Sequence, residues 1–239
     1  MKVLYLDVDC LKNQDLFEEK LQGMSGQRRE KIISYKYDSD RRLSLGAGIL
    51  LDEGLKEIGY REKQLNYSVN KQGKPYYREL SQFYFNLSHS GHYAVAAFSD
   101  MPVGVDIEEK KIDKTRLGIA KRFFHEKEYS LLKNIKDKRE QMELFYRIWT
   151  LKESFVKAAG GGMSILFQSF CTLPCEIVSF GGEEMRDIDE DNLSMKNVFS
   201  IETEQMGRVY FKYCDEVEGY CLAVCSQKDE KIEWIEVQI

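Results

Sequence analysis

The sequence predicts an α+β fold, because short segments with the two-residue period of strands alternate with longer segments that have the 3.6-residue period of helices. Residues 101–108 alternate apolar and polar side chains, which is typical of a strand. Residues 141–159 carry apolar side chains at mostly helical spacing and stop at three consecutive glycines, a strong signal for the end of a helix. With 239 residues, the chain can bury a substantial core.

The first hundred residues contain a turn and a pair of strands. Gly73, followed by Lys74 and Pro75, predicts a tight turn. Residues 83–98 predict two strands joined by a loop at 86–91, because that loop is rich in hydroxyl, imidazole and glycine groups.

The last third of the chain predicts further strands and carries no distinctive chemical motif. An acidic segment that begins with two glycines predicts a surface loop at 181–192. Three alternating segments predict antiparallel strands at 197–204, 208–214 and 219–225.

The strand at 101–108 carries two carboxylates, Asp106 and Glu108, on either side of Ile107. The period of a strand places both on one face, with their Cα atoms about 6–7 Å apart. That separation lets one oxygen of each side chain reach a single divalent ion. An isolated Asp-x-Glu is more often a solvated acidic face of an ordinary strand, so a metal site requires a third ligand.

The helix at 141–159 supplies such a ligand. Trp149, Glu153 and Lys157 recur every four residues and therefore lie along one helical face, with Lys152 beside them. A lone Glu–Lys pair at this spacing is commonly a surface ion pair worth about 0.2–0.5 kcal/mol. The large indole on the same stripe favours the wall of a cleft instead. Three carboxylates suit Mg²⁺, and the lysines would neutralise phosphate oxygens, whereas zinc would require close histidine or cysteine ligands.

The loop at 86–91 offers groups for a phosphorylated ligand. Ser88 and His89 can donate hydrogen bonds to phosphate oxygens, and Gly91 lets a ligand approach the backbone. A histidine in a loop is more often a solvated surface residue, so this segment gains meaning only beside the acidic residues.

Composition excludes several classes of protein. The net charge of −5 argues against the broad basic surface of a nucleic-acid-binding protein. No apolar run approaches the roughly 20 residues that span a bilayer, and Asp7 and Asp9 interrupt the apolar start that a signal peptide would need. The six cysteines include no Cys-x-x-Cys pair, which fits reduced thiols. We expect a cytoplasmic protein with no nucleic-acid or membrane partner.

Three separated motifs carry a resemblance to a known family. They are Asn86-Leu-Ser-His-Ser-Gly91, Gly104-Val-Asp-Ile-Glu108 and Trp149-x-x-Lys152-Glu153-x-x-x-Lys157. In this order and spacing they resemble the 4'-phosphopantetheinyl transferases of the surfactin-synthetase-activating (Sfp) type. The likeness covers most of residues 25–170. Such enzymes move the phosphopantetheine arm of coenzyme A to a serine of an acyl or peptidyl carrier protein and release adenosine 3',5'-bisphosphate.

The resemblance implies a role for each acidic and basic residue of these motifs. Asp106, Glu108 and Glu153 would hold Mg²⁺. Lys157 would stabilise the leaving phosphate, and Lys152 would contact the same phosphates.

The proton of the carrier's serine needs an acceptor, and three candidates remain open. They are the carboxylates of Glu153 and Glu128 and a metal-bound water. The sequence does not choose among them.

The resemblance also implies contacts at the nucleotide end of coenzyme A, which is the substrate. Cations for the 3'-phosphate would come from Arg28, Lys31 and Arg42, with His89 joining them. The residues expected to border the adenine are Gly73, Lys74, Pro75 and Ser88.

The family is a pseudo-dimer of two similar halves, each a small, mostly antiparallel sheet packed with helices. This sequence fits, because residues 4–9 are similar to residues 103–108 and each segment is followed by a long amphipathic helix, near 38–58 and 138–159. The resemblance implies a monomer with an internal pseudo-two-fold axis.

The expected boundary divides the chain into residues 1–103, which would contact the nucleotide, and residues 104–239, which would hold the metal and the catalytic helix.

Carrier proteins are usually acidic, as this chain is, so recognition should use a local apolar patch. The candidates lie near the helix at 126–132 and the segment at 160–166, which carry Tyr129, Leu131, Met163 and Leu166. The resemblance leaves open whether the carrier belongs to fatty acid, polyketide or nonribosomal peptide synthesis.

Two other functions could use the same residues. One is a metal-dependent phosphohydrolase or nuclease, which would need no carrier. The other is a non-catalytic module that binds coenzyme A or a nucleotide, in which Glu153 and Lys157 form only an ion pair.

Overall fold

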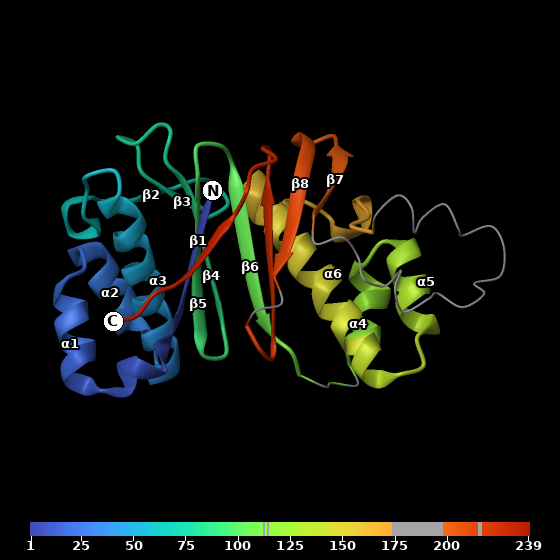
Figure 1. Cartoon of the computed structure of the whole chain (residues 1–239), viewed down its shortest axis with the longest axis horizontal. Helices are drawn as coiled ribbons and strands as arrows, with labels where there is room; N and C mark the ends of the chain where they lie inside the picture. Colours follow the sequence, from blue (N-terminus) through green and yellow to red (C-terminus); the bar gives the residue numbers. More distant parts are fainter. Residues whose placement is uncertain (112, 114, 174–197, 215–216) are drawn as a thin grey trace.

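Two four-stranded β-sheets lie at the centre of the molecule, and helices cover the outer face of each sheet (Figure 1). The computed structural model describes residues 1–111, 113, 115–173, 198–214 and 217–239. The sheets are mostly antiparallel, which confirms the predicted α+β class. The expected acidic loop at 181–192 lies outside the described residues.

The first sheet has the strand order β10-β1-β5-β4. β1 pairs with β5, and β5 with β4, in antiparallel fashion, whereas β10 lies parallel to β1. The elements of this part are β1 (Lys2–Asp7), η1 (Val8–Lys12), α1 (Gln14–Gln22), α2 (Gly26–Ser34), α3 (Asp38–Lys56), η2 (Glu62–Gln64), the paired β2 (Ser68–Val69) and β3 (Pro75–Tyr76), β4 (Tyr84–Ser90), β5 (Tyr93–Ser99) and β10 (Glu233–Glu236).

The second sheet has the strand order β6-β9-β8-β7, and all its neighbours are antiparallel. The three strands expected in the last third of the chain are therefore confirmed. The elements here are β6 (Val103–Glu109), α4 (Arg116–Phe123), α5 (Glu126–Asn134), α6 (Lys138–Ala159), η3 (Gly162–Ser164), η4 (Phe167–Ser169), β7 (Val198–Thr203), β8 (Gly207–Cys214) and β9 (Tyr220–Ser226).

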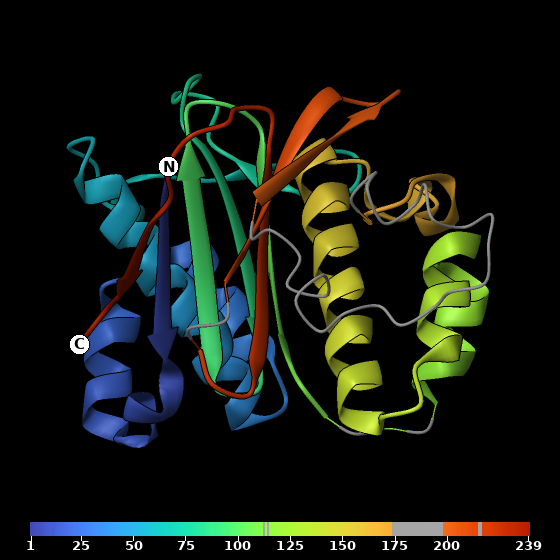
Figure 2. The ribbon, with the colours of Figure 1, turned by 45° about the vertical axis from the view of Figure 1, so that its right-hand side comes forward.

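The two sheets pack face to face, and each strand alternates between two cores as the period of two requires. In β5, Ala94 belongs to the core beneath α1 to α3, whereas Val95 belongs to the core between the sheets. In β9, Val224 faces the first sheet and Ala223 faces α6. Figure 2 shows α6 between the second sheet and the outer helices α4 and α5, so the molecule has two β layers between two helical layers.

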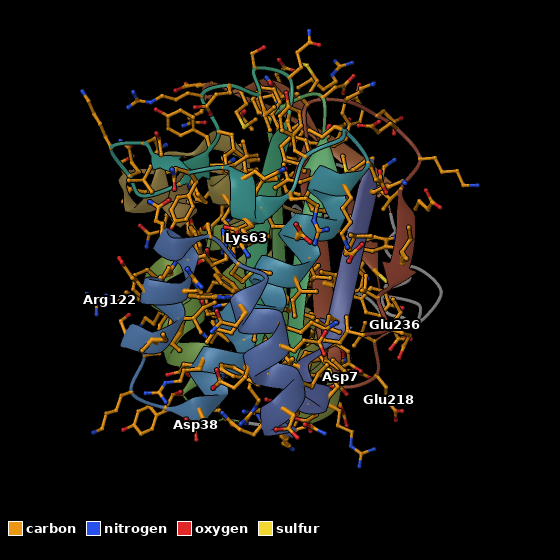
Figure 3. All side chains as sticks on the ribbon, turned by 90° about the vertical axis from the view of Figure 1, so that its left-hand side faces the viewer. Asp7, Asp38, Lys63, Arg122, Glu218 and Glu236 are labelled. Atoms are coloured by element: carbon orange, nitrogen blue, oxygen red, sulfur yellow. The ribbon has the colours of Figure 1, made fainter. Side chains whose placement is uncertain are left out.

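Some charged side chains lie at the periphery of these layers. Arg122 on α4 and Glu236 on β10 point outward at opposite edges of the view in Figure 3. Within the described residues, no helix has the length and apolar content needed to cross a membrane.

Helix α6 begins and ends where local chemistry requires. Asp137 accepts hydrogen bonds from the backbone N–H groups of Arg139 and Glu140, and Gly160 ends the helix with a φ of 65°. Gly104 of β6 lets the helix lie against the strand, because a Cβ atom there would stand 2.0 Å from the carbonyl oxygen of Ser154. The predicted helix and its glycine stop are confirmed.

The hairpin of β4 and β5 differs from the sequence prediction. Residues 86–90 belong to strand β4, and the turn falls at Gly91 and His92, where Gly91 has a φ of 57°. The polar side chains that suggested a loop occupy alternate positions on one face of the strand, and this face meets the second half of the molecule.

Among the described residues, strand β10 crosses the expected boundary between the halves. β5 ends at Ser99 and β6 begins at Val103, close to the expected boundary, but β10 returns to the first sheet and pairs with β1. This pairing joins residues separated by more than 200 positions, so no local pattern could indicate it.

Side chains bridge the two sheets where edge strand β4 meets edge strand β6. Oδ1 of Asn86 accepts a hydrogen bond from the N–H of Val105, and Oγ of Ser90 accepts one from the N–H of Glu109. Side chains, and not a ladder of backbone hydrogen bonds, join β4 to β6 here. The functional groups of both strands therefore face the line of contact between these two strands, which we call the seam.

Candidate active site

Asp106 lies at the centre of this seam. Its Oδ1 accepts hydrogen bonds from Nζ of Lys157 at 2.6 Å and from Oγ of Ser88 at 2.9 Å. Lys157 also donates to Oγ of Ser88 at 2.9 Å, which closes a triangle between β4, β6 and α6. Asp106 is only 3% exposed, so the alternative of a solvated acidic strand face does not apply to it.

The second oxygen of Asp106 is the unusual one. Oδ2 is buried and has no hydrogen-bond partner among the described residues. Burial raises the pKa of Asp106 above its ordinary value, although the charge of Lys157 opposes this shift. A buried carboxylate oxygen without a partner is costly and fits a site that awaits a cation.

Glu108 and Glu153 complete a cluster of negative charge with Asp106. Burial is the largest cause that raises the pKa of both carboxyls, and the charge of Asp106 is the next. The charge of Glu108 also raises the pKa of Glu153. Oγ of Ser90 donates to Glu108 at 3.0 Å, and a hydrogen bond from Trp149 likewise opposes the shift of the Glu108 pKa. The strand and the helix thus bring all three predicted carboxylates within range of one another's charges.

This donor set fits Mg²⁺ in its chemistry, because it consists of hard carboxylate oxygens, one of which lacks a partner. In the described part of the chain, no three carboxylate, histidine or cysteine side chains already stand close enough together to hold one ion. The ammonium of Lys157 supplies the counter-charge of Asp106 in this arrangement.

The structure corrects the expectation for Lys152 and Glu128. Both side chains are fully buried, and Nζ of Lys152 lies 2.8 Å from Oε2 of Glu128. The same ammonium donates to the carbonyl oxygens of Phe167 and Phe170, while Oε1 of Glu128 accepts from the N–H and hydroxyl of Thr172. They tie α5, α6 and the segment after α6 together and do not face the seam.

The helical period explains this outcome. One step along a helix turns the side chain by about 100°, so neighbours in sequence point in different directions. Glu153 faces the carboxylates of β6, whereas Lys152 points toward α5 and meets Glu128. Neither a phosphate contact for Lys152 nor proton transfer by Glu128 is compatible with this burial.

Arg28 also lies elsewhere than expected. It is 4% exposed, and its Nε donates to Oε1 of Glu62 at 2.8 Å. The guanidinium stands 5.3 Å from the ring centre of Tyr67. Arg28 is therefore paired and packed within the first half, which corrects its assignment to a phosphate.

The other cations of the first half are better placed for an anion. Lys31 is exposed at the surface, and Nε of Arg42 is buried without a hydrogen-bond partner among the described residues. Burial lowers the pKa of His89, and the positive charges of Lys157 and Lys31 lower it further. His89 therefore lies within reach of the charges of both lysines.

The hairpin of β2 and β3 closes one end of the seam. Gly73 has a φ of 88°, which confirms the predicted turn. Nζ of Lys74 points into the protein and donates to three backbone carbonyl oxygens, and burial lowers its pKa to about 8. The ammonium is thus turned away from solvent, which leaves the backbone of Gly73 to Pro75 as the part that a ligand can border.

A cavity of about 420 Å³ lies beside this hairpin. Tyr76, Tyr84 and Pro102 line it together with the end of α6 at Ala158–Gly160. Its lining does not include the three carboxylates, so the cavity is separate from the acidic cluster.

Two contributors to the site, Asn86 and Ser90, were not predicted. The sequence predicts a loop for both, although Asn86, Ser88 and Ser90 stand two residues apart. That period of two is the signal that could have placed them on one face of a strand.

Comparison with known proteins agrees with these motifs. A family model described as "4'-phosphopantetheinyl transferase superfamily" matches residues 102–225, and one described as "4'-phosphopantetheinyl transferase, N-terminal" matches residues 12–100.

Individual relatives extend the likeness to most of the chain. "4'-phosphopantetheinyl transferase ffp" of Bacillus subtilis is 36% identical over 171 residues, which cover 71% of this chain and 75% of the relative. "4'-phosphopantetheinyl transferase Sfp" of Bacillus subtilis (strain 168) is 35% identical over the same shares. A "4'-phosphopantetheinyl transferase" of Bacillus subtilis is 31% identical over 222 residues, or 92% of this chain and 90% of the relative. The chain therefore belongs to the 4'-phosphopantetheinyl transferase superfamily and is an enzyme of its Sfp type.

Proposed function

We propose that this protein transfers the 4'-phosphopantetheine arm of coenzyme A to a serine of an apo acyl or peptidyl carrier protein, in a Mg²⁺-dependent reaction that releases adenosine 3',5'-bisphosphate. The observation that carries the proposal is the triangle of Asp106, Lys157 and Ser88, with Glu108 and Glu153 beside it. It joins an acidic cluster to a lysine that could bind a phosphate, in a seam between two sheets.

The reaction forms a bond between the serine oxygen and the β-phosphorus of coenzyme A and breaks the bond from that phosphorus to the bridging oxygen. The bridging oxygen leaves with adenosine 3',5'-bisphosphate, and the serine proton passes to a base. The main demands are alignment and the neutralisation of phosphate charge. The enzyme's residues must therefore hold the pyrophosphate and accept a proton.

Asp106, Glu108 and Glu153 are the residues that would hold Mg²⁺. A bound Mg²⁺ supplies positive charge that stabilises the pyrophosphate as negative charge develops on it. Lys157 would bind the phosphate that leaves, because its ammonium already lies in the seam and is carried by a flexible side chain.

Glu153 is the acceptor that the placement of the groups favours for the serine proton. Its carboxylate lies beside those of Asp106 and Glu108, in the seam that would hold the pyrophosphate. Glu128 is excluded from this part because it is fully buried against Lys152.

The nucleotide end would lie against the first half of the chain. Lys31, Arg42 and His89 would bind the 3'-phosphate, and the backbone of Gly73 to Pro75 would border the adenine. Support comes from the exposure of Lys31, the unpartnered Nε of Arg42 and the shared electrostatic region of His89, Lys31 and Lys157.

Carrier recognition would use Leu166, which is 67% exposed. Phe123, at 41% exposure, is a second exposed apolar side chain on the same half, and Gln168 donates to the carbonyl of Arg122 next to it. Leu131 is buried in the core and therefore cannot contribute, and the side chain of Met163 lies outside the described residues. Replacing Leu166 with Asp should raise KM for the carrier and leave the affinity for coenzyme A unchanged; an unchanged carrier KM would contradict this assignment.

The pseudo-dimer organisation has support in the strand orders. β1, β5 and β4 follow one another in the first sheet as β6, β9 and β8 do in the second, and the long helices α3 and α6 occupy corresponding places in the chain. We extend the proposal to a monomeric cytoplasmic enzyme, which agrees with the absence of a disulfide among the five cysteines described.

The function is tested by incubating the protein with coenzyme A, Mg²⁺ and apo carrier proteins from fatty acid, polyketide and nonribosomal peptide synthesis. Intact mass spectrometry should show at least one carrier gaining a phosphopantetheine group. Breakdown of coenzyme A without any carrier modification would favour a hydrolase, and binding without breakdown would favour a non-catalytic module.

A further inference from the structure

Lys74 connects the loop between β2 and β3 to the strand and the helix that carry the proposed catalytic residues. It ends the loop between β2 and β3, where Oδ1 of Asn70 accepts hydrogen bonds from the N–H groups of Gln72 and Lys74. From this loop the Lys74 side chain crosses to the second half. Its Nζ lies 2.5 Å from the carbonyl oxygen of Lys157, 3.2 Å from that of Ala158 and 3.0 Å from that of Val103.

Two of these acceptors belong to the last turn of α6. The final carbonyl groups of a helix have no partner within the helix, and the helix dipole places partial negative charge there. An ammonium at this position satisfies the carbonyl groups of Lys157 and Ala158 and neutralises part of that charge. Asn70 adds a bond from its Nδ2 to the carbonyl oxygen of Gly160 at 3.1 Å.

The third acceptor belongs to the strand that carries the metal ligands. Val103 is the first residue of β6, three positions before Asp106. Lys74 therefore bonds to both the end of α6 and the start of β6, which already touch at Gly104 and Ser154. The side chain of Lys157 then points from this fixed backbone to Asp106 and Ser88.

We propose that Lys74 is a positioning residue, whose ammonium holds the backbone of Lys157 against β6 and so places the Lys157 side chain for phosphoryl transfer. The inference rests on the proposed function, because it assumes that Lys157 binds the leaving phosphate. It also separates Lys74 from the nucleotide: its side chain acts on catalysis, not on coenzyme A binding. Through the same residue the loop at 70–74 is connected to the end of the catalytic helix.

The test is the variant Lys74→Met, which keeps most of the side-chain volume and removes the donors. Coenzyme A affinity is measured by calorimetry and turnover by carrier modification at saturating coenzyme A. We expect kcat to fall by about tenfold to a hundredfold, as for a misplaced catalytic group, while Kd for coenzyme A stays within about threefold.

A matched control is Lys212→Met. Lys212 on β8 also donates to a backbone carbonyl, that of Glu230, but its neighbours in sequence, Phe211 and Tyr213, are the residues that face α6. This variant should lose stability and keep the wild-type kcat. If Lys74→Met lowers Tm and leaves kcat unchanged, Lys74 is merely structural and the inference is overturned.

A loss of coenzyme A affinity with normal kcat would also overturn it, because that result indicates direct contact with the nucleotide. Should Lys74→Met not fold, Lys74→Arg serves instead: it keeps the charge on a longer side chain, so a positioning role predicts a lower kcat with normal coenzyme A binding. If Lys74→Arg changes neither kcat nor the affinity for coenzyme A, the charge alone matters and the positioning role is overturned. Failure of the proposed function itself is recognised separately, as an inactive wild type on every carrier.

Discussion

The ammonium of Lys157 lies 2.6 Å from Oδ1 of Asp106, so a residue proposed to bind phosphate is paired with a residue proposed to bind metal. The pair is partly screened from solvent, with the lysine 27% and the aspartate 5% exposed. An ammonium and a metal ion cannot both neutralise the same carboxylate without repelling each other. Binding of coenzyme A would draw Lys157 toward the phosphates and free Asp106.

Removal of this lysine should strengthen metal binding in the absence of coenzyme A. In Lys157→Met the competing charge is gone, so Mn²⁺, used as a spectroscopic substitute, should bind about tenfold tighter than to the wild type, as a neighbouring like charge is worth one pKa unit or more. Electron paramagnetic resonance of free Mn²⁺ measures this. Lys31→Met serves as the control, because it removes a nearby charge that has no ion pair with Asp106. Equal Mn²⁺ affinity of Lys157→Met and wild type would disprove the competition.

Glu153 should make the metal-free protein less stable as the pH rises. Its pKa is raised in the folded state, so the native protein holds this proton more tightly than the unfolded chain does. Stability then decreases as the pH rises from the ordinary pKa of a glutamate through the folded pKa, and the full penalty is present above that range. Lowering the pH restores the lost stability.

Glu153→Gln should therefore have a higher Tm than the wild type at pH 8 in the presence of a chelator. The difference in Tm between the two proteins should decrease toward pH 5. A difference of a few degrees is expected, since 1 kcal/mol shifts Tm by roughly 2–4 °C for a chain of this size. Glu140→Gln on the same helix is a control, because Glu140 is exposed and outside the cluster. A lower Tm for Glu153→Gln at pH 8 would show that the carboxylate is stabilised in the folded state.

The buried pair of Lys152 and Glu128 should matter for folding more than for ligand binding. Lys152→Met leaves Glu128 buried with its charge uncompensated, which costs about 3–5 kcal/mol in other proteins. Urea unfolding should show this loss, and the double variant Lys152→Met/Glu128→Gln should recover part of it. Coenzyme A affinity of the folded variants should match the wild type. A folded Lys152→Met variant with normal stability and weak coenzyme A binding would instead support the phosphate contact that the sequence suggested.

Arg28 and Lys31 should separate stability from recognition of the 3'-phosphate. Lys31→Met should weaken coenzyme A binding about tenfold, the value of one charge-assisted hydrogen bond. It should have no effect on dephospho-coenzyme A, which lacks that phosphate. Arg28→Met should lower stability, because it leaves Glu62 buried without its charged partner, and should change neither affinity in the folded protein. Calorimetry with both ligands measures these affinities. If Arg28→Met loses the preference for coenzyme A over dephospho-coenzyme A, Arg28 binds the 3'-phosphate and the assignment is reversed.

The sequence predicted the elements that depend on local pattern. The strand that carries Asp106 and Glu108 and the helix that ends at Gly160 are both present, because periodicity and a glycine stop act within a few residues. The turn at Gly73 is present for the same reason.

The misplaced residues depend on partners that are distant in the chain. Lys152 and Arg28 resemble ligand-binding cations in sequence, but Glu128 and Glu62 lie opposite them in the fold and neutralise them. β10 pairs with β1 from the other end of the chain. The sequence predicts a loop at Ser88 because the segment around it is polar, although the Ser88 side chain faces a second strand and not water.

Transfer of phosphopantetheine is tested most directly by the number of nucleotide molecules released for each carrier modified. Adenosine 3',5'-bisphosphate is quantified by chromatography while the mass of the carrier is followed, with a carrier whose acceptor serine is replaced by alanine as the control. We predict one nucleotide released for each carrier modified, and none with the alanine carrier. Release of the nucleotide at the same rate with the alanine carrier, or with no carrier at all, would contradict the account.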